Sequence, residues 1–119
     1  MLFASLLMAQ LATVAPSYAE AKARADEYEA LLLPKDSAAL VEAQARALEA
    51  ALLLCGPAPT RGAPVTIVVQ VSRDGLPTNV WRKGESAFGI CMEDQLATAR
   101  LPVATGKAFH TSYELTFAP

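Results

Sequence analysis

The chain has few of the residues on which nucleic-acid-binding and catalytic sites usually depend. It carries one histidine and one tryptophan, and its 10 lysines and arginines are outnumbered by 12 aspartates and glutamates, for a net charge of −2. Without a basic surplus or a basic stripe, nucleic acid and anionic membrane surfaces are poor candidate partners. At 119 residues the chain is expected to form a single domain.

The first nineteen residues contain no charged side chain. Their apolar run, Leu2 to Val14, is shorter than the roughly 20 residues that a helix needs to cross a bilayer. Pro16 ends this run, and Ser17 and Ala19 place small residues at the −3 and −1 positions of a cleavage site. We therefore expect a signal peptide at residues 1–19, export to the periplasm and no membrane span after cleavage. A buried N-terminal helix of a cytosolic protein is the alternative.

Only two cysteines are present, Cys55 and Cys91. Export would place them in an oxidising compartment, where an even number of cysteines favours a disulfide. Such a bridge would close a loop of about 37 residues and add roughly 3–4 kcal/mol of stability in the chain-entropy model. Two buried free thiols are the alternative. Because neither cysteine has a ligand-type neighbour, we expect no metal site, and no motif suggests a cofactor.

Three segments have the pattern of strands. Ile67, Val69 and Val71 alternate with polar residues and predict a strand with one buried face. Asp74-Gly75 predicts a hairpin turn, and residues 78–81 the return strand. Phe109 to Phe117 also alternates, which predicts a third strand with one solvated face.

Three further segments are rich in helix formers, at residues 20–33, 38–54 and 88–100. Pro34 is expected to stop or kink the first, and Asp36 and Ser37 to cap the second. Ser86 is the candidate cap of the third, in which Glu93 and Asp94 would complement the dipole near its N-terminal end. The apolar stripe expected to pack in the second helix comprises Val41, Ala45, Leu48, Leu52 and Cys55.

The order helix, helix, strand, strand, helix, strand predicts the fold class. We expect an α+β domain in which helices cover one face of a small three-stranded antiparallel sheet. Ala21, Ala25, Tyr28 and Leu32 form the predicted packing face of the N-terminal helix. The pattern predicts no particular oligomeric state.

Several residues of this pattern coincide with those of a known family. They are the extended run into Asp74-Gly75, Val80 beyond the hairpin, Leu101-Pro102 after a helix, and the run from Tyr113 to Phe117. On these residues the chain from about Ala38 to Pro119 resembles the TonB C-terminal domain.

Within that group the chain is most similar to the AgmX/PglI type of C-terminal domain. That type has one cysteine ahead of its first strand and another at the start of its second helix, at the positions of Cys55 and Cys91, and Leu101-Pro102 followed by Gly106 matches its turn. The resemblance thus assigns residues 38–119 to a TonB C-terminal-like domain with the order α-β-β-α-β. The expected signal peptide (1–19) and an N-terminal helix with a proline-containing turn (20–37) precede it.

The resemblance implies a non-enzymatic periplasmic domain that binds a protein or peptide partner in the cell envelope. In TonB, the domain adds an extended peptide from an outer-membrane receptor to its sheet edge. This chain lacks the proline-rich spacer of TonB, and its apolar segment looks cleavable, so energy transduction is not expected. The N-terminal helix at residues 20–33 lies outside the family pattern and is expected either to cover an edge or to dock a partner. A small secreted inhibitor or immunity-type protein is the alternative function.

Trp81, Arg82 and Tyr113 are the candidate partner-binding residues. Trp and Arg are enriched at binding hot spots, and Tyr113 lies in a strand that could accept a peptide if its edge is open. The alternatives are that Trp81 packs on the sheet or the N-terminal helix, and that the edge is protected. His110, the only histidine, is expected on a solvated strand face, so we predict no catalytic set.

Overall fold

The computed structural model describes residues 15–117. Residues 1–14 of the predicted signal peptide therefore lie outside the described residues. The helices and strands are α2 (Tyr18–Leu31), α3 (Pro34–Cys55), β1 (Val65–Val71), β2 (Pro77–Lys83), α4 (Ala87–Leu96) and β3 (Phe109–Leu115). The strands form one antiparallel sheet in the order β2-β1-β3. This arrangement confirms the predicted α+β class, a small sheet covered by helices with an N-terminal helix in addition.

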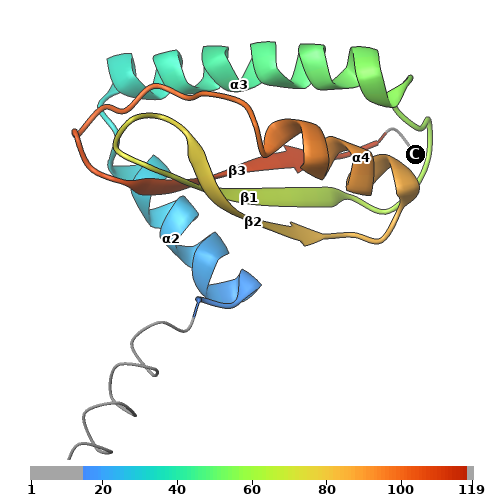
Figure 1. The fold of residues 1–119 in the computed structure, drawn as a ribbon, viewed down its shortest axis with the longest axis horizontal. Coiled ribbons are helices and arrows are strands. Elements are labelled where there is room, and N and C mark those ends of the chain that lie inside the picture. The colour runs from blue at the N-terminus through green and yellow to red at the C-terminus, as the bar shows by residue number, and fades with distance from the viewer. Residues whose placement is uncertain (1–14, 118–119) are drawn as a thin grey trace, which may run out of the picture.

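The central strand β1 is buried on both faces. Ile67, Val69 and Val71 pack in the main apolar core with residues of α3 and α4, whereas Val68 packs against Ala21 and Ala25 of α2. Figure 1 shows α3 and α4 on one side of the sheet and α2 crossing on the other. Helices were predicted on one face of the sheet, and α2 covers the second face in addition, which the alternation of apolar and polar residues in the strands does not reveal.

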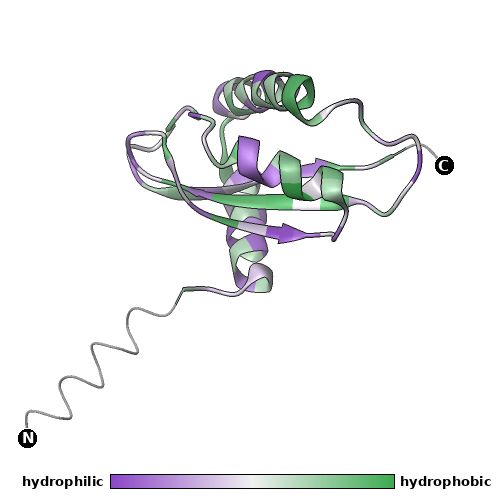
Figure 2. Cartoon of the chain, turned by 45° about the vertical axis from the view of Figure 1, so that its right-hand side comes forward, coloured by the Kyte–Doolittle hydropathy of each residue, from purple (hydrophilic) through white to green (hydrophobic). Residues whose placement is uncertain are grey.

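The main core lies between the sheet and the pair α3 and α4. Figure 2 shows β1 as a hydrophobic strand, whereas the end of β2 is hydrophilic. In α4, Met92 and Leu96 are buried, whereas Ile90 is 43% exposed. The fully or nearly fully buried members of this core are Leu40, Ala51, Val65, Ile67, Val69, Val71, Met92, Leu96, Leu101, Phe109 and Tyr113.

Helix α2 begins at Ser17, whose hydroxyl accepts a hydrogen bond from the backbone N–H of Glu20 at 3.2 Å. The Glu20 carboxylate accepts the backbone N–H of Ser17 in return, at 3.3 Å, which completes a capping box. Helix α3 begins at Pro34, which was predicted to stop the preceding helix. Proline at the first helical position gives up no hydrogen bond, because that N–H has no partner inside the helix.

The buried face of α3 agrees with the predicted stripe in part. Leu48, Leu52 and Cys55 pack against the main core as predicted. Leu40 and Ala51 are buried as well, whereas Val41 is 60% exposed and Ala45 is also exposed. Alanine and leucine occur all around this helix, so apolar periodicity does not select one face. The packing face is instead set by the contacts of α3 with the sheet and with α4.

Helix α4 ends at Leu96, earlier than predicted, and places its acidic residues differently. Ser86 is the predicted cap, and its hydroxyl accepts the backbone N–H of Gly89 at 3.0 Å. Glu93 and Asp94 do not lie in the first turn, so they do not complement the positive end of the helix dipole. Glu93 instead lies beside Arg82 of β2, with 3.6 Å between Arg82 Nε and Glu93 Oε1.

The hairpin between β1 and β2 turns at Gly75, as predicted. Gly75 has φ +87° and is buried, its N–H donates to Ser72 O at 2.9 Å, and its carbonyl accepts the Leu101 N–H at 2.9 Å. A Cβ at residue 75 would lie 2.6 Å from the Leu101 carbonyl oxygen. Glycine is required here both by the left-handed backbone and by the close approach of the segment after α4.

We expect Gly75→Ala to lower the free energy of unfolding by about 2–4 kcal/mol, since a left-handed φ costs an L-residue about 1–2 kcal/mol and overpacking adds about 1–3. Gly106→Ala is the matched control, because Gly106 has φ +72° but no atom within 4 Å of a Cβ built there. It should lower stability by about 1 kcal/mol. Urea unfolding of both variants measures the difference, and equal losses would contradict the steric role of Leu101.

Candidate functional site

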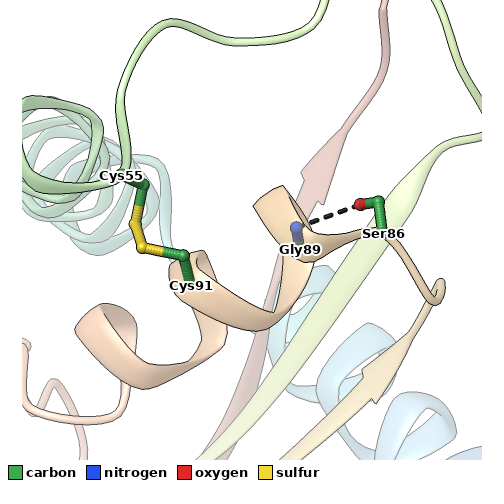
Figure 3. The surroundings of a disulfide bond; sticks show 4 residues. All are labelled: Cys55, Ser86, Gly89 and Cys91. Carbon is green, nitrogen blue, oxygen red and sulfur yellow. Dashed lines mark hydrogen bonds between the residues drawn. A yellow bond between two sulfur atoms is a disulfide. The ribbon is translucent and has the colours of Figure 1, made fainter.

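The disulfide between Cys55 and Cys91 confirms the predicted pair and joins the end of α3 to α4 (Figure 3). The two Cα atoms lie 5.7 Å apart. On its other side α4 lies against the sheet at Gly89, where a Cβ would lie 3.1 Å from Cγ1 of Val65. The bridge and this close approach together hold α4 on the main core.

A three-stranded sheet has two edges, and in this fold helices α2 and α3 cover the β3 edge at Ser112. The Glu29 carboxylate of α2 accepts the backbone N–H of Ser112 at 2.9 Å and the Thr111 hydroxyl at 2.6 Å. The side-chain amide of Gln44, on α3, donates to the Ser112 carbonyl at 3.1 Å and to the Thr111 hydroxyl oxygen at 3.1 Å. Both backbone groups of Ser112 are thus satisfied by side chains, which leaves no pair of groups there for an added strand.

Helix α2 passes around this edge from one face of the sheet to the other. Its N-terminal half places Ala21 and Ala25 on Val68, and its C-terminal half stacks the Tyr28 ring on Phe109 with ring centroids 4.5 Å apart. Lys22 also pairs with Glu114 of β3 at 2.9 Å. The N-terminal helix thus covers part of the β3 edge, which is one of the two roles predicted for it, and the docking of a partner by this helix stays a prediction.

The β2 edge differs, and the register of the sheet shows which of its backbone groups point outward. Successive residues of a strand direct their N–H and C=O groups to alternate sides. Because the groups of Ser112 point away from β1, those of its register partner Val68 point toward β2. Val68 is paired with Trp81, so the groups of Trp81 point toward β1 and those of Val80 and Arg82 point outward.

No strand pairs with the outer side of β2 among residues 15–117. Within the same range, the backbone N–H and C=O groups of Val80 and Arg82 form no hydrogen bond with a turn, a loop or a side chain. The edge is nevertheless short. Pro77 opens the strand, the register is irregular at Gln70/Val71, and Lys83 closes the strand with an exposed cation, all of which limit unplanned edge-to-edge pairing.

Arg82 and Trp81 lie on opposite faces of β2. The Arg82 guanidinium donates to the Gly84 carbonyl and lies near the carboxylates of Glu85, at 3.9 Å, and Glu93. Its side chain is 17% exposed, so its charge is largely engaged within the domain. Its Nε has no hydrogen-bond partner within the described chain. Arg82 therefore fixes the position of β2 against α4, and its role in partner binding stays a prediction.

Trp81 packs on the N-terminal end of α2, as the alternative interpretation of this residue expected. Its indole N–H donates to the Pro16 carbonyl at 2.9 Å, and it contacts the small cluster of Ala21, Ala25 and Val68. The Trp81 and His110 rings lie 5.7 Å apart. The indole is half-buried, so only part of it is available to a partner.

Two strand residues are more buried than the sequence suggested. Tyr113 is 2% exposed and lies in the main core, so its side chain does not belong to a partner-binding surface. Burial raises the pKa of its phenol, whose oxygen has no hydrogen-bond partner among the described residues. His110 is 9% exposed and not solvated as expected, because α2 and Trp81 cover its face of the sheet. Burial, with a smaller contribution from Arg24, lowers the pKa of His110.

The comparisons with known proteins add no relative: no protein-family model, curated protein or solved structure matches the chain. Within residues 15–117, no group of three or more histidine, cysteine or acidic side chains is placed to hold a metal ion. None of the helices in that range is long and apolar enough to cross a membrane.

The pKa of His110 predicts how stability responds to acid. Its folded-state pKa lies below 6.5, so on acidification the unfolded chain takes up the proton first. Stability should therefore be complete above pH 6.5 and fall as the pH drops from 6.5 toward the folded-state pKa. Urea unfolding between pH 7.5 and 5 measures this slope, and an NMR titration of the imidazole gives the pKa itself. His110→Gln should flatten the slope in this range, and a folded-state pKa above 6.5 would contradict the prediction.

Proposed function

We propose that this chain is a non-enzymatic exported binding module of the cell envelope that acts by contact with a protein or an extended peptide. The observation that supports it is the asymmetry of the sheet. At the β3 edge, Glu29 and Gln44 take both backbone groups of Ser112, while the outward groups of Val80 and Arg82 have no partner among the described residues. An edge of this kind can receive an extended segment through main-chain hydrogen bonds.

The proposed TonB-like character is supported by the order of elements from α3 to β3, which is α-β-β-α-β. The bridge between Cys55, ahead of β1, and Cys91, in the helix before β3, fits the AgmX/PglI type that the sequence resembles. Helix α2 is the main difference from that pattern. Because it closes the β3 edge, β2 is the edge that we propose for strand addition.

Export is supported by the disulfide, because such bonds form and persist in oxidising compartments. The proposed cleavage after Ala19 has a structural consequence, since it falls within the first turn of α2. It would remove Ser17, which caps the helix, and Pro16, whose carbonyl accepts the Trp81 indole. Loss of the cap would cost about 0.5–2 kcal/mol, so the mature module would hold the start of α2 less firmly.

The compartment can be tested on the protein recovered from fractionated cells. We expect the intact mass of a chain that begins at Glu20. We also expect Cys55 and Cys91 to accept a thiol-labelling reagent only after reduction. The disulfide of the structure requires the second result if the chain is exported. A chain that keeps Met1 and has freely labelled thiols would contradict both export and the envelope role.

The β2 edge can be tested with a proline at Val80. Because the Val80 N–H points away from β1, Val80→Pro removes a donor from the open edge without breaking the pairing with β1. Val80→Thr is the matched control, since it keeps the N–H and suits a strand. We expect a partner captured from solubilised envelopes by the wild-type chain to bind Val80→Thr within about twofold and Val80→Pro at least tenfold more weakly, because main-chain hydrogen bonds supply affinity in strand addition.

The same capture experiment separates the two candidate functions. A transport or motility component that depends on the Val80 N–H would support the binding module. A hydrolase whose activity falls on addition of the purified chain would favour the inhibitor. Equal binding of both Val80 variants would contradict strand addition at β2.

A further inference from the structure

We propose that the outer face of α3 is a contact surface for a second copy of this chain, in which two α3 helices pack antiparallel across a two-fold axis. The proposal goes beyond the binding module and uses neither edge of the sheet. It rests on the apolar side chains that α3 leaves exposed, on the order of the charges along this helix, and on how firmly the helix is held.

The first observation is that exposed apolar side chains gather on α3. Five of the seven large apolar residues that are exposed in the described chain lie on α3 or at its junction with α2: Leu31, Leu33, Val41, Leu53 and Leu54. Figure 1 shows α3 as the outermost layer, with no element over its outer side, and Figure 2 shows its C-terminal turns as hydrophobic. Apolar surface that gathers on one outer element is typical of an interaction site.

The second observation is that this surface is symmetric about the middle of the helix. Leu33 and Leu53 are 67% and 87% exposed and lie at equal distances from residue 43 along the chain. In an antiparallel pair with its axis near that residue, Leu33 of each copy meets Leu53 of the partner subunit, so one patch complements itself. Between these two ends the exposed face carries Ala38 and Ala45, whose small side chains let the helix axes approach closely.

The third observation is the order of the charges on this face. Lys35 lies near the start of α3 and Glu49 near its end, both are exposed, and neither forms an ion pair within residues 15–117. Antiparallel packing places each Lys35 beside Glu49 of the partner subunit, whereas parallel packing would place like charges together. The two unpaired charges therefore favour a second copy of the same helix in the antiparallel orientation.

The charges at the middle of the face fit the same arrangement. Glu42 and Arg46 form an ion pair one turn apart on the exposed side of α3. With the axis near residue 43, each Arg46 also lies beside Glu42 of the partner subunit. The four side chains then alternate in sign around the axis, and networks of this kind contribute more than isolated surface pairs.

The helix is held firmly enough to present this face in a fixed form. The disulfide joins its end to α4, and Leu40 and Ala51 pack in the main core. Because the face is already formed, little ordering entropy is lost on pairing. Helix α3 and the β2 edge lie on different sides of the domain (Figure 1), so the pair would present two β2 edges. If the proposed binding function holds, the pair is a bivalent binder.

Sedimentation velocity of the full chain, over a range of protein concentrations, tests the pairing. A face one helix wide is smaller than the standard interface of about 1,600 Å², so we expect a dissociation constant on the order of 10–100 µM. All variants share one N-terminus, so the segment before α2 contributes equally to each. A chain that stays monomeric up to about 1 mM would overturn the proposal and would leave the face to a different protein, and growth beyond a dimer would overturn the closed two-fold pair.

Charge reversal tests the orientation of the helices. Glu49→Lys and Lys35→Glu should each weaken the dimer at least tenfold, because each places two pairs of like charges in contact. Glu27→Lys is the matched control for net charge, since Glu27 is exposed on α2 and forms no ion pair among the described residues. It should dimerise within about twofold of the wild type. Equal weakening by Glu27→Lys and Glu49→Lys would overturn the assignment to α3.

A mixture of the two reversed variants gives the most specific result. In a pair of one Glu49→Lys chain and one Lys35→Glu chain, both contacts between opposite charges are restored. The equimolar mixture should therefore dimerise like the wild type, although neither variant does so alone, and the double variant should regain the dimer as well. A mixture that stays monomeric would overturn the antiparallel register.

The apolar ends of the face are tested separately. Leu53→Ala should weaken the dimer at least threefold, whereas Leu76→Ala, which removes an exposed leucine from the hairpin, should leave it unchanged. Val80→Pro should dimerise like the wild type, so a failure of pairing is distinct from a failure of strand addition at β2. A dimer that is lost in Val80→Pro and unaffected by Glu49→Lys would place the contact at the β2 edge and overturn the proposal.

Discussion

The structure depends on the complete burial of β1. Val65, Ile67, Val68, Val69 and Val71 are each at most 1% exposed, and the strand pairs with a neighbour on both sides. Each such side chain contributes about 1.5–3 kcal/mol when it is removed from water. A sheet of three strands cannot bury both faces of its central strand by itself, so helices are required on both. The main core supplies one cover and α2 supplies the other, and this need places α2 next to the β3 edge.

The two edges of the sheet therefore have different surroundings for a topological reason. Helix α2 reaches α3 by passing around β3, and on the way it brings Glu29 to the outward groups of Ser112. On the other side, α4 and the start of α2 contact the faces of β2 through Arg82 and Trp81, but neither helix turns around the edge. The satisfaction of the Ser112 backbone groups by side chains at the β3 edge follows from the path of the chain, and the proposed binding role of the β2 edge depends on this difference.

Sequence patterns predicted the local features of this fold well, because local features have local causes. The alternation of β1, the turn at Gly75 and the cap at Ser86 each depend on a few neighbouring residues, and the paired cysteines followed from their number and the expected compartment. The errors concern which face of a helix or strand is buried. His110 looked solvated because nothing in β3 indicates that α2 covers it, and Val41 looked buried because it lies at helical spacing from apolar residues that do pack against the core. Glu29 was missed because its partner Ser112 lies 83 residues away, and no local signal marks a carboxylate that will accept a backbone N–H.

Helix α2 covers β3 through polar and apolar contacts, and these two kinds of contact contribute differently to stability. A hydrogen bond within a protein contributes only about 0.5–1.5 kcal/mol net, or about 1.5–3 when one partner is charged, because water replaces it on opening. An apolar cover has no such replacement, since its removal exposes area that only another apolar surface can cover. Helix α2 combines both kinds of contact, because Glu29 and Lys22 form polar bonds with β3 while Ala21 and Ala25 cover Val68. Loss of α2 would therefore expose the second face of β1 as well as the Ser112 N–H, so the apolar contacts tie this helix to the fold more firmly than its polar bonds alone would.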